Sequence, residues 1–430
     1  MKYALGNMLN GAGSLNPDGL SLDLRFAADK TLTARKGPTP VFTRASAATF
    51  VGSDGLIQSA AVNAARFDHD PLTLACKGLL IEESRTNLCL QSNAFSTSPW
   101  ANINTVCNVS QNETGVDGIA NSAWTFTDDS NVNAEGRFLT ASLTSGVGYS
   151  VSIFVKKTTG TPSTYPAIWL ARGGNFGGCV INTTAGTATV ITVFGAGTII
   201  STTASVVDFG NFWRVTSFIT PNATGSWEIS ISPSGNGTGT GVMDGTTTGS
   251  AVFWGAQLEV GAFPTSYIST TTGSVVRSAD VCSITGSAFT EFFGSSPAEF
   301  TWNTSFSHLP TRVAQLNLRT IADFSNGGNR RWVYGDANTN DTFQGKYFEV
   351  TNNVTMGIAS SYPYKIAMAL TPTNNFFSVN GATAGSGVTS GALLSSVTGL
   401  HIGQTGSYHF QYLKGYKKRL SNAKLQTLST

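Results

Sequence analysis

Residues 149–155 read Tyr-Ser-Val-Ser-Ile-Phe-Val, and the odd-numbered side chains from Tyr149 to Val155 are all apolar or aromatic. This period of two predicts a β-strand with one buried face. Similar short runs lie on both sides of it, at Ala123-Trp-Thr-Phe126 and Trp227-Glu-Ile-Ser-Ile231, and turns rich in Gly, Thr and Asn separate them. Because no helical pattern intervenes, residues 88–270 are predicted to form one β-sandwich of the jelly-roll kind.

A second set of strand patterns occupies residues 290–430, with examples at Tyr364-Lys-Ile-Ala-Met-Ala-Leu370 and His409-Phe-Gln-Tyr-Leu413. These strands predict another β-sandwich. One helix is expected over Ser421–Leu428, because Ser421 is a good N-cap and Leu425 and Leu428 lie on one helical face.

The remaining residues read as an anchor and a linker. Residues 1–87 contain few apolar runs. Within them, Asp54-Gly55 predicts the turn of a hairpin. We expect this N-terminal region to pack on a neighbouring domain or on another subunit. Residues 271–289 begin with a Ser/Thr-rich stretch and are predicted to be a linker. The predicted fold is therefore all-β, with two β-sandwich domains in tandem behind an irregular N-terminal region.

The composition of the 430-residue chain limits the function classes. Charged residues make up 12% of the chain, about half the usual share. The net charge is +2, and the basic residues are scattered except for Lys414, Lys417, Lys418 and Arg419. Nucleic-acid binding needs a concentrated basic stripe, so no nucleic-acid partner is expected.

The cysteines and the apolar runs bear on the cellular compartment. The five cysteines are an odd number without a CxxC pair, which predicts free thiols and assembly in a reducing cytoplasm. The first eight residues contain no continuous apolar run, so no signal peptide is expected. No stretch reaches the roughly 18 apolar residues of a membrane-spanning helix, and membrane insertion is not expected.

Residues for catalysis are not apparent. The chain contains no GxSxG, HExxH or GxxxxGK[ST] motif. Its four histidines do not follow metal-ligand spacing, and the paired carboxylates Glu82–Glu83, Asp128–Asp129 and Glu291–Glu299 come without an aromatic cleft motif. We therefore predict no catalytic residue, no enzyme activity and no bound metal or other cofactor. Calcium at Asp128–Asp129 or at Gly241–Asp244 is the alternative to turn capping by these Asp residues.

Aromatic side chains with polar neighbours are candidates for sugar binding, because a sugar ring stacks on an aromatic face while its hydroxyls bond to polar groups. In the first sandwich the candidates are Trp169, Arg172 and Asn175. In the second they are Arg330, Trp332, Tyr334 and Asp336. The alternative for the tryptophans is that they fill a core, as we predict for Trp124, Trp213, Trp227 and Trp254.

Residues 251–259, Ala-Val-Phe-Trp-Gly-Ala-Gln-Leu-Glu, are predicted to be the closing strand of the first sandwich. Uninterrupted alternation places Val252, Trp254, Ala256 and Leu258 on one face, and Phe253, Gln257 and Glu259 on the other. This run therefore serves mostly in packing.

Several pieces in a fixed order resemble a known family. They are Phe42-Thr-Arg-Ala-Ser-Ala-Ala-Thr-Phe50, Asp54-Gly-Leu-Ile57, Arg66-Phe-Asp68, Gly78-Leu-Leu-Ile-Glu-Glu-Ser-Arg-Thr-Asn-Leu88, Trp254-Gly-Ala-Gln-Leu-Glu259 and Thr265-Ser-Tyr-Ile268. Together they resemble bacteriophage head-spike and fibre proteins. The middle of the chain is similar to their carbohydrate-binding-module-like jelly roll, and residues 290–430 to a concanavalin or laminin-G sandwich.

The resemblance implies a structural protein on the surface of a tailed-phage virion, on the head or on the tail. It implies contacts with other capsid or tail proteins, assembly as a homotrimer, and attachment to host-surface glycans. Two alternatives remain open. One is a polysaccharide depolymerase on the virion, and the other is a passive capsid decoration protein.

Overall fold

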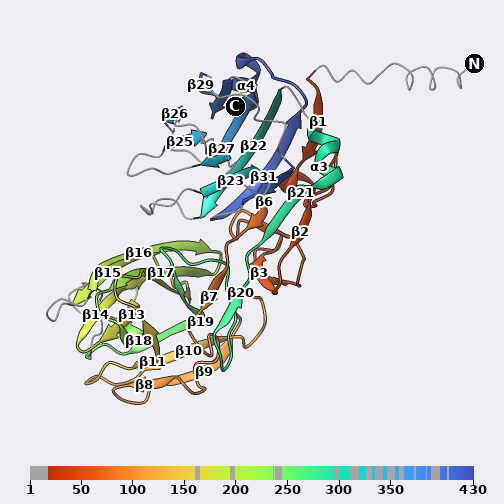
Figure 1. Ribbon diagram of the computed structural model, residues 1–430. Coiled ribbons are helices and arrows are strands. Elements are labelled where there is room, and N and C mark those ends of the chain that lie inside the picture. Colours follow the sequence, from red (N-terminus) through yellow and green to blue (C-terminus); the bar gives the residue numbers. More distant parts are fainter. Residues whose placement is uncertain are drawn as a thin grey trace, which may run out of the picture.

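The computed structural model describes residues 18–159, 165–193, 199–235, 237, 245–294, 299–309, 319–325, 332–334, 342–345, 354–357, 363–371, 374–383, 385–388, 398–403 and 406–430. Within these ranges the protein is all-β, as predicted. Antiparallel strands form two β-sandwiches, one above the other in Figure 1, and the described helices are short.

The first sandwich consists of two six-stranded sheets, ordered β16-β17-β12-β19-β10-β9 and β15-β14-β13-β18-β11-β8. Their strands are β8 (Ala101–Ile103), β9 (Asn108–Glu113), β10 (Ala123–Asp128), β11 (Gly136–Leu143), β12 (Tyr149–Lys156), β13 (Tyr165–Arg172), β14 (Asn175–Asn182), β15 (Thr187–Val193), β16 (Ile199–Phe209), β17 (Phe212–Pro221), β18 (Gly225–Gly235) and β19 (Gly249–Val260).

The core of the first sandwich lies between its two sheets. The alternating side chains Tyr149, Val151, Ile153 and Val155 of β12 all enter it, as the period of two predicts. They meet residues such as Ile168 from the opposite sheet. Trp124 and Trp227 also lie in this core and are 6% and 0% exposed, which confirms the prediction for these two tryptophans.

The second sandwich consists of an eight-stranded sheet, ordered β29-β28-β27-β22-β31-β6-β5 with β1 also paired to β31, and a five-stranded sheet, ordered β2-β21-β30-β23-β24. Its strands are β1 (Leu20–Leu24), β2 (Val41–Thr43), β5 (Arg66–His69), β6 (Cys76–Ile81), β21 (Val281–Thr285), β22 (Phe300–Leu309), β23 (Arg319–Ser325), β24 (Trp332–Tyr334), β27 (Tyr364–Leu370), β28 (Asn374–Val379), β29 (Gly385–Val388), β30 (Gly399–Ile402) and β31 (Ser407–Tyr416).

Three strand pairs and three helices complete the described elements. They are β3 (Ala48–Val51) with β4 (Ile57–Ala60), β7 (Arg85–Asn87) with β20 (Val275–Arg277), β25 (Thr342–Gly345) with β26 (Val354–Gly357), α2 (Phe26–Asp29), α3 (Gly286–Phe293) and α4 (Asn422–Leu428). The β3–β4 hairpin turns at the predicted Asp54-Gly55, where Gly55 has a φ of +79°. The predicted C-terminal helix is confirmed, and the Ser421 side chain accepts a hydrogen bond from the backbone N–H of Lys424.

The N-terminal region is part of the second sandwich. Strand β1 pairs with residues 413–416 of β31, and β6 pairs with residues 408–410 of the same strand. Leu22, Leu24, Leu79 and Ile81 lie in one apolar core with residues of the C-terminal strands. Figure 1 shows this as red and orange strands lying beside blue ones. The expected packing on a neighbouring domain is thus present, and it takes the form of shared sheets.

Residues 271–289, predicted to be a linker, instead contribute a strand and a helix to the second sandwich. Strand β21 is paired on both sides, with β2 and with β30, and α3 buries Phe289, Phe292 and Phe293 in the core of the second sandwich. The first sandwich is therefore an insertion in the second one. The short β7–β20 pair, in which Asn87 lies opposite Val275, connects the two.

No helix in the described ranges has both the length and the apolar character needed to span a membrane.

Candidate functional site: a cleft at the junction of the two sandwiches

The sugar-binding candidates of the first sandwich lie on the hairpin formed by β13 and β14. Trp169 is 2% exposed and belongs to an apolar cluster with Ala167, Val180 and Ile191, so its ring is not open to a sugar. This position corrects the prediction for Trp169. Asn175 is 7% exposed, and its side-chain amide donates hydrogen bonds to the carbonyls of Arg172 and Gly173, each at 3.1 Å. Asn175 therefore holds the hairpin turn.

The candidates of the second sandwich are not brought together with those of the first. Trp332 and Tyr334 belong to the edge strand β24, in register with Ala322 and Arg319 of β23. Arg330 and Asp336 lie outside the described residues.

The calcium candidate Asp128 caps a loop. Its carboxylate accepts hydrogen bonds from the backbone N–H groups of Ser130 and Glu135, at 3.2 and 3.3 Å. Asp244 lies outside the described residues. No group of three or more His, Cys, Asp and Glu residues suited to a metal ion occurs in the ranges that the structure describes.

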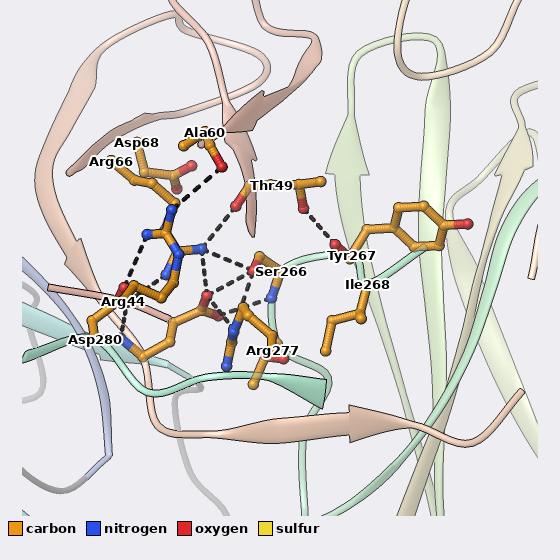
Figure 2. A network of polar contacts seen from close by, with 12 residues as sticks. Arg44, Thr49, Ala60, Arg66, Asp68, Ser266, Tyr267, Ile268, Arg277 and Asp280 are labelled. Carbon is orange, nitrogen blue, oxygen red and sulfur yellow. Dashed lines mark hydrogen bonds and ion pairs between the residues drawn. The ribbon is translucent and has the colours of Figure 1, made fainter. Parts of the chain in front are cut away.

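The sequence pieces from 42–50, 66–68, 78–88 and 265–268 converge at the junction of the two sandwiches. There, five charged side chains form one buried network, which we call the junction network and which consists of Arg44, Arg66, Glu82, Arg277 and Asp280 (Figure 2). Each of these side chains is at most 1% exposed. Three guanidinium groups face two carboxylates, so the network carries one positive charge in excess.

Glu82 lies at the centre of the junction network. Its carboxylate pairs with Arg66 at 2.7 Å and with Arg277, and it accepts two hydrogen bonds from Ser266. Burial by itself raises the pKa of Glu82, but the guanidinium groups of Arg277 and Arg66 outweigh it and hold that pKa well below its usual range. Glu82 is ionised, 1% exposed and held between two guanidinium groups, which suits a structural role and not acid–base catalysis.

Asp280 joins the remaining members of the network. It pairs with Arg66 and, at 3.1 Å, with Arg44, and it also accepts a hydrogen bond from the backbone N–H of Glu82 at 2.8 Å. A buried charge without a partner is costly. Arg66 pairs with both carboxylates, whereas Arg44 depends on Asp280 and Arg277 on Glu82. The junction network thus ties β5, β6 and the segment after β20 to Ser266 of the first sandwich.

A cleft of about 640 Å³ opens beside this network. One wall is the outer face of β16 and β17, with Thr203, Ser205 and Phe218. The opposite wall includes Lys77 of β6 in the second sandwich and Phe50 of the β3–β4 hairpin. The volume falls within the roughly 300–1,000 Å³ typical of small-molecule sites.

Arg214 of β17 lines the cleft. Its Nη2 donates hydrogen bonds to the Thr265 carbonyl at 2.7 Å and the Ser152 hydroxyl at 3.3 Å. Its guanidinium carbon lies 5.3 Å from the centre of the Phe154 ring. Among the described residues it forms no ion pair, and its Nε is buried without a hydrogen-bond partner. Burial lowers the pKa of Arg214, while the more distant Glu259 and Glu82 oppose that shift.

His409 and Asp68 also line the cleft. The Nε2 of His409 lies 2.8 Å from Asp68 Oδ2, and Asp68 Oδ1 accepts a hydrogen bond from the Val51 N–H at 2.7 Å. His401, by contrast, belongs to β30 in the other sheet of this sandwich. The carboxylate of Asp68 is thus occupied by His409 and Val51, and it does not form an ion pair with Arg214.

The sequence contains a signal for Arg214. In Trp213-Arg-Val-Thr-Ser-Phe-Ile219, alternation places Arg214, Thr216 and Phe218 on the face opposite Val215 and Ile219, which lie in the core. When one face of a strand carries both a charged residue and a Phe, that face is expected to be covered by another part of the protein or to bind a ligand. The partner wall comes from residues more than 130 positions away, so the cleft itself is not apparent from the sequence.

Comparisons with known proteins leave the family open. No family model matches the chain, and no curated protein matches it. Among solved structures, a Trypanosoma rangeli sialidase is similar at 9% identity and a TM-score of 0.23, over 71% of this chain and 60% of the sialidase chain. The LG1–3 region of the laminin α2 chain is similar at 12% identity and a TM-score of 0.15, over 68% of this chain and 67% of that one. At these TM-scores neither likeness carries an argument about function.

Proposed function

We propose that this chain is an attachment protein on the surface of a tailed-phage virion, a spike or fibre that binds host-surface glycans. The observation that carries the glycan-binding part is the cleft between the two sandwiches. Its walls offer hydroxyl groups on Thr203, Ser205 and Thr216 and aromatic rings on Phe50 and Phe218. Hydroxyls match the polar edge of a sugar ring, and aromatic rings match its apolar face.

The virion location rests on the resemblance of the ordered sequence pieces to phage spike and fibre proteins. The structure adds that most of these pieces meet around the junction network, where they join two sandwiches. A stiff junction suits a protein that must hold a binding site away from a particle. Assembly as a homotrimer would multiply weak contacts with a repetitive glycan.

Two measurements test the proposal. Gold-labelled antibodies against the protein should bind intact virions at a defined structure on the head or tail. The purified protein should bind glycans of the host surface and block adsorption of the phage when added in excess. Absence of label from virions would overturn the location, and a glycan array without any signal at millimolar sugar would favour a passive decoration protein.

The same preparation separates adhesion from depolymerisation. Incubation with host capsule or lipopolysaccharide should leave the polymer length unchanged. Release of reducing ends would instead identify a depolymerase. Light scattering coupled to gel filtration measures the subunit number, and a stable monomer would contradict the trimer.

A further inference from the structure

We propose that the cleft between the sandwiches recognises an anionic saccharide, and that Arg214 is the residue that receives the anionic group. This inference rests on the proposed glycan binding, but it does not depend on where the protein sits on a virion. The class of ligand follows from the positive charge of Arg214, which no carboxylate in the described part of the chain pairs with.

Arg214 lacks a counter-ion within the described part of the chain. The two carboxylates that act on it from a distance are already engaged. Glu259 accepts hydrogen bonds from the Gln257 amide and from both the N–H and the hydroxyl of Thr265. Glu82 pairs with Arg66 and Arg277. Neither carboxylate therefore neutralises Arg214.

A charged group out of bulk water is costly unless it is paired. The contact with Phe154 and the two hydrogen bonds of Nη2 offset part of this cost. Within the described ranges the hydrogen bonds of Arg214 are those of Nη2, so Nη1 keeps both of its hydrogens for a ligand. A carboxylate or phosphate that enters the cleft would supply the missing charge and form charge-assisted hydrogen bonds.

The surroundings of Arg214 favour a negative ligand further. The junction network beside the cleft has one positive charge in excess. Its member that lines the cleft is Glu82, whose carboxylate is already paired with Arg66 and Arg277. Lys77 on the opposite wall is 34% exposed, and its nearest carboxylate, on Asp70, lies 3.7 Å away. An exposed pair of this length is weak, so Lys77 is available as a second cation.

Hydroxyl groups and rings next to Arg214 suit the rest of a sugar. Ser205 and Thr203 are exposed on β16, and Phe209 and Phe218 are half-buried on the same face of the sheet. An anionic group held by Arg214 would place an attached sugar ring against these side chains.

The test uses the full chain and two ligands that differ only in charge. Oligogalacturonate and its methyl ester have nearly the same shape, and calorimetry or ligand-observed NMR measures their affinities. We expect the free acid to bind at least about tenfold more tightly than the ester. A glycan array with uronic-acid, phosphorylated and neutral sugars distinguishes a carboxylate from a phosphate ligand.

Arg214→Gln should weaken binding of the acid by about tenfold or more and leave binding of the ester unchanged. Arg137→Gln is the matched control, because Arg137 lies on β11 in the other sheet, where its Nη2 likewise donates a hydrogen bond to a backbone carbonyl, and it should change neither affinity. If Arg214→Gln does not fold, Ser205→Trp tests the same cleft by filling it from an exposed position, and it should also abolish binding of the acid.

The outcomes separate the two proposals. Binding of neutral sugars alone, or equal binding of acid and ester, would overturn the anionic ligand and leave glycan binding standing. Acid binding that survives both Arg214→Gln and Ser205→Trp would overturn the assignment to this cleft. An array blank for every sugar would overturn both proposals.

Discussion

Glu82 and Ser266 are 184 residues apart in the sequence, and two hydrogen bonds join them across the junction of the sandwiches. The backbone N–H of Ser266 donates to one carboxylate oxygen at 2.8 Å, and its hydroxyl donates to the other at 2.7 Å. Because Glu82 also pairs with Arg66 and Arg277, this contact couples the first sandwich to the charges that hold the second one together.

Glu82→Gln should destabilise the protein strongly. The substitution keeps the shape of the side chain and removes the negative charge, which leaves Arg66 and Arg277 buried with one carboxylate, Asp280, nearby. Breaking a buried ion pair costs about 3–5 kcal/mol. Denaturant unfolding should show this loss in the free energy of unfolding.

Glu83→Gln is the control for this substitution. The neighbouring Glu83 side chain is 36% exposed and pairs with Arg85, so its charge is largely solvated. Exposed pairs of this kind contribute about 0–1 kcal/mol. Equal effects of the two substitutions would contradict the central role of Glu82.

The stabilisation by Glu82 should depend on pH in a defined direction. The pKa of this carboxyl is lower in the folded protein than the ordinary value of 4.5, so the folded state holds the ionised form more strongly than the unfolded state does. The contribution is complete above pH 4.5 and is lost as the pH falls below it. The difference in unfolding free energy between the natural protein and Glu82→Gln should therefore shrink in acid. A constant difference between pH 7 and pH 3 would contradict this account.

The five cysteines should differ in reactivity. All are free thiols, as the sequence predicted. Cys89, Cys107, Cys179 and Cys282 are buried, and burial raises the pKa of the last three to about 12. Cys76 is half-buried and should be the first to react with a thiol reagent near pH 8. Mass spectrometry of the labelled native protein should locate one modification, and Cys76→Ser should remove it.

Strand alternation predicted the faces of β12 correctly but failed in β19. The structure places Phe253, Ala256 and Leu258 in the core, whereas Trp254 lies on the outer face in a separate cluster with Phe154 and Tyr267. A bulge causes this exchange. Between the pairs Ser152–Gln257 and Phe154–Trp254, β19 has one residue more than β12, and Gly255 there has a φ of +62°. A sequence pattern alone does not reveal an extra residue in one strand.

Gly255→Ala should therefore be more costly than a change at an ordinary turn glycine. An added Cβ would meet the Tyr267 ring at 3.1 Å, and the backbone conformation is unfavourable for alanine. We expect a loss of about 2–3 kcal/mol. Gly146→Ala is the control, because Gly146 has a φ of +75° and nothing lies within 4 Å of an added Cβ. Its loss of about 1–2 kcal/mol measures backbone strain alone.

The fold class and most strands were predictable because they depend on local alternation. The division into domains was not, because strand pairing between distant segments leaves no local trace. Residues 1–87 looked too poor in apolar runs for a core of their own, and the reason is that β1 and β6 complete a sheet with β31. The cleft is not predictable from the sequence for the same reason, since its walls come from segments that are distant in the chain.

The insertion of the first sandwich makes a deletion test possible. Asn87 and Val275 lie opposite each other in the β7–β20 pair, so an Asn-Gly turn can replace residues 88–274. All five members of the junction network remain in the shortened chain. It should therefore keep a folded second sandwich, with a cooperative thermal transition in calorimetry and a β-type circular dichroism spectrum.

Removal of residues 1–87 should have the opposite effect. It takes away β1, β5 and β6 from the eight-stranded sheet, together with Arg44, Arg66 and Glu82. The second sandwich would lose Leu22, Leu24, Leu79 and Ile81 from its core and should not fold, while residues 88–270 remain protected from proteolysis. In a tandem arrangement behind a separate anchor, both sandwiches would survive this truncation. Survival of residues 290–430 under limited proteolysis would therefore contradict the inserted architecture.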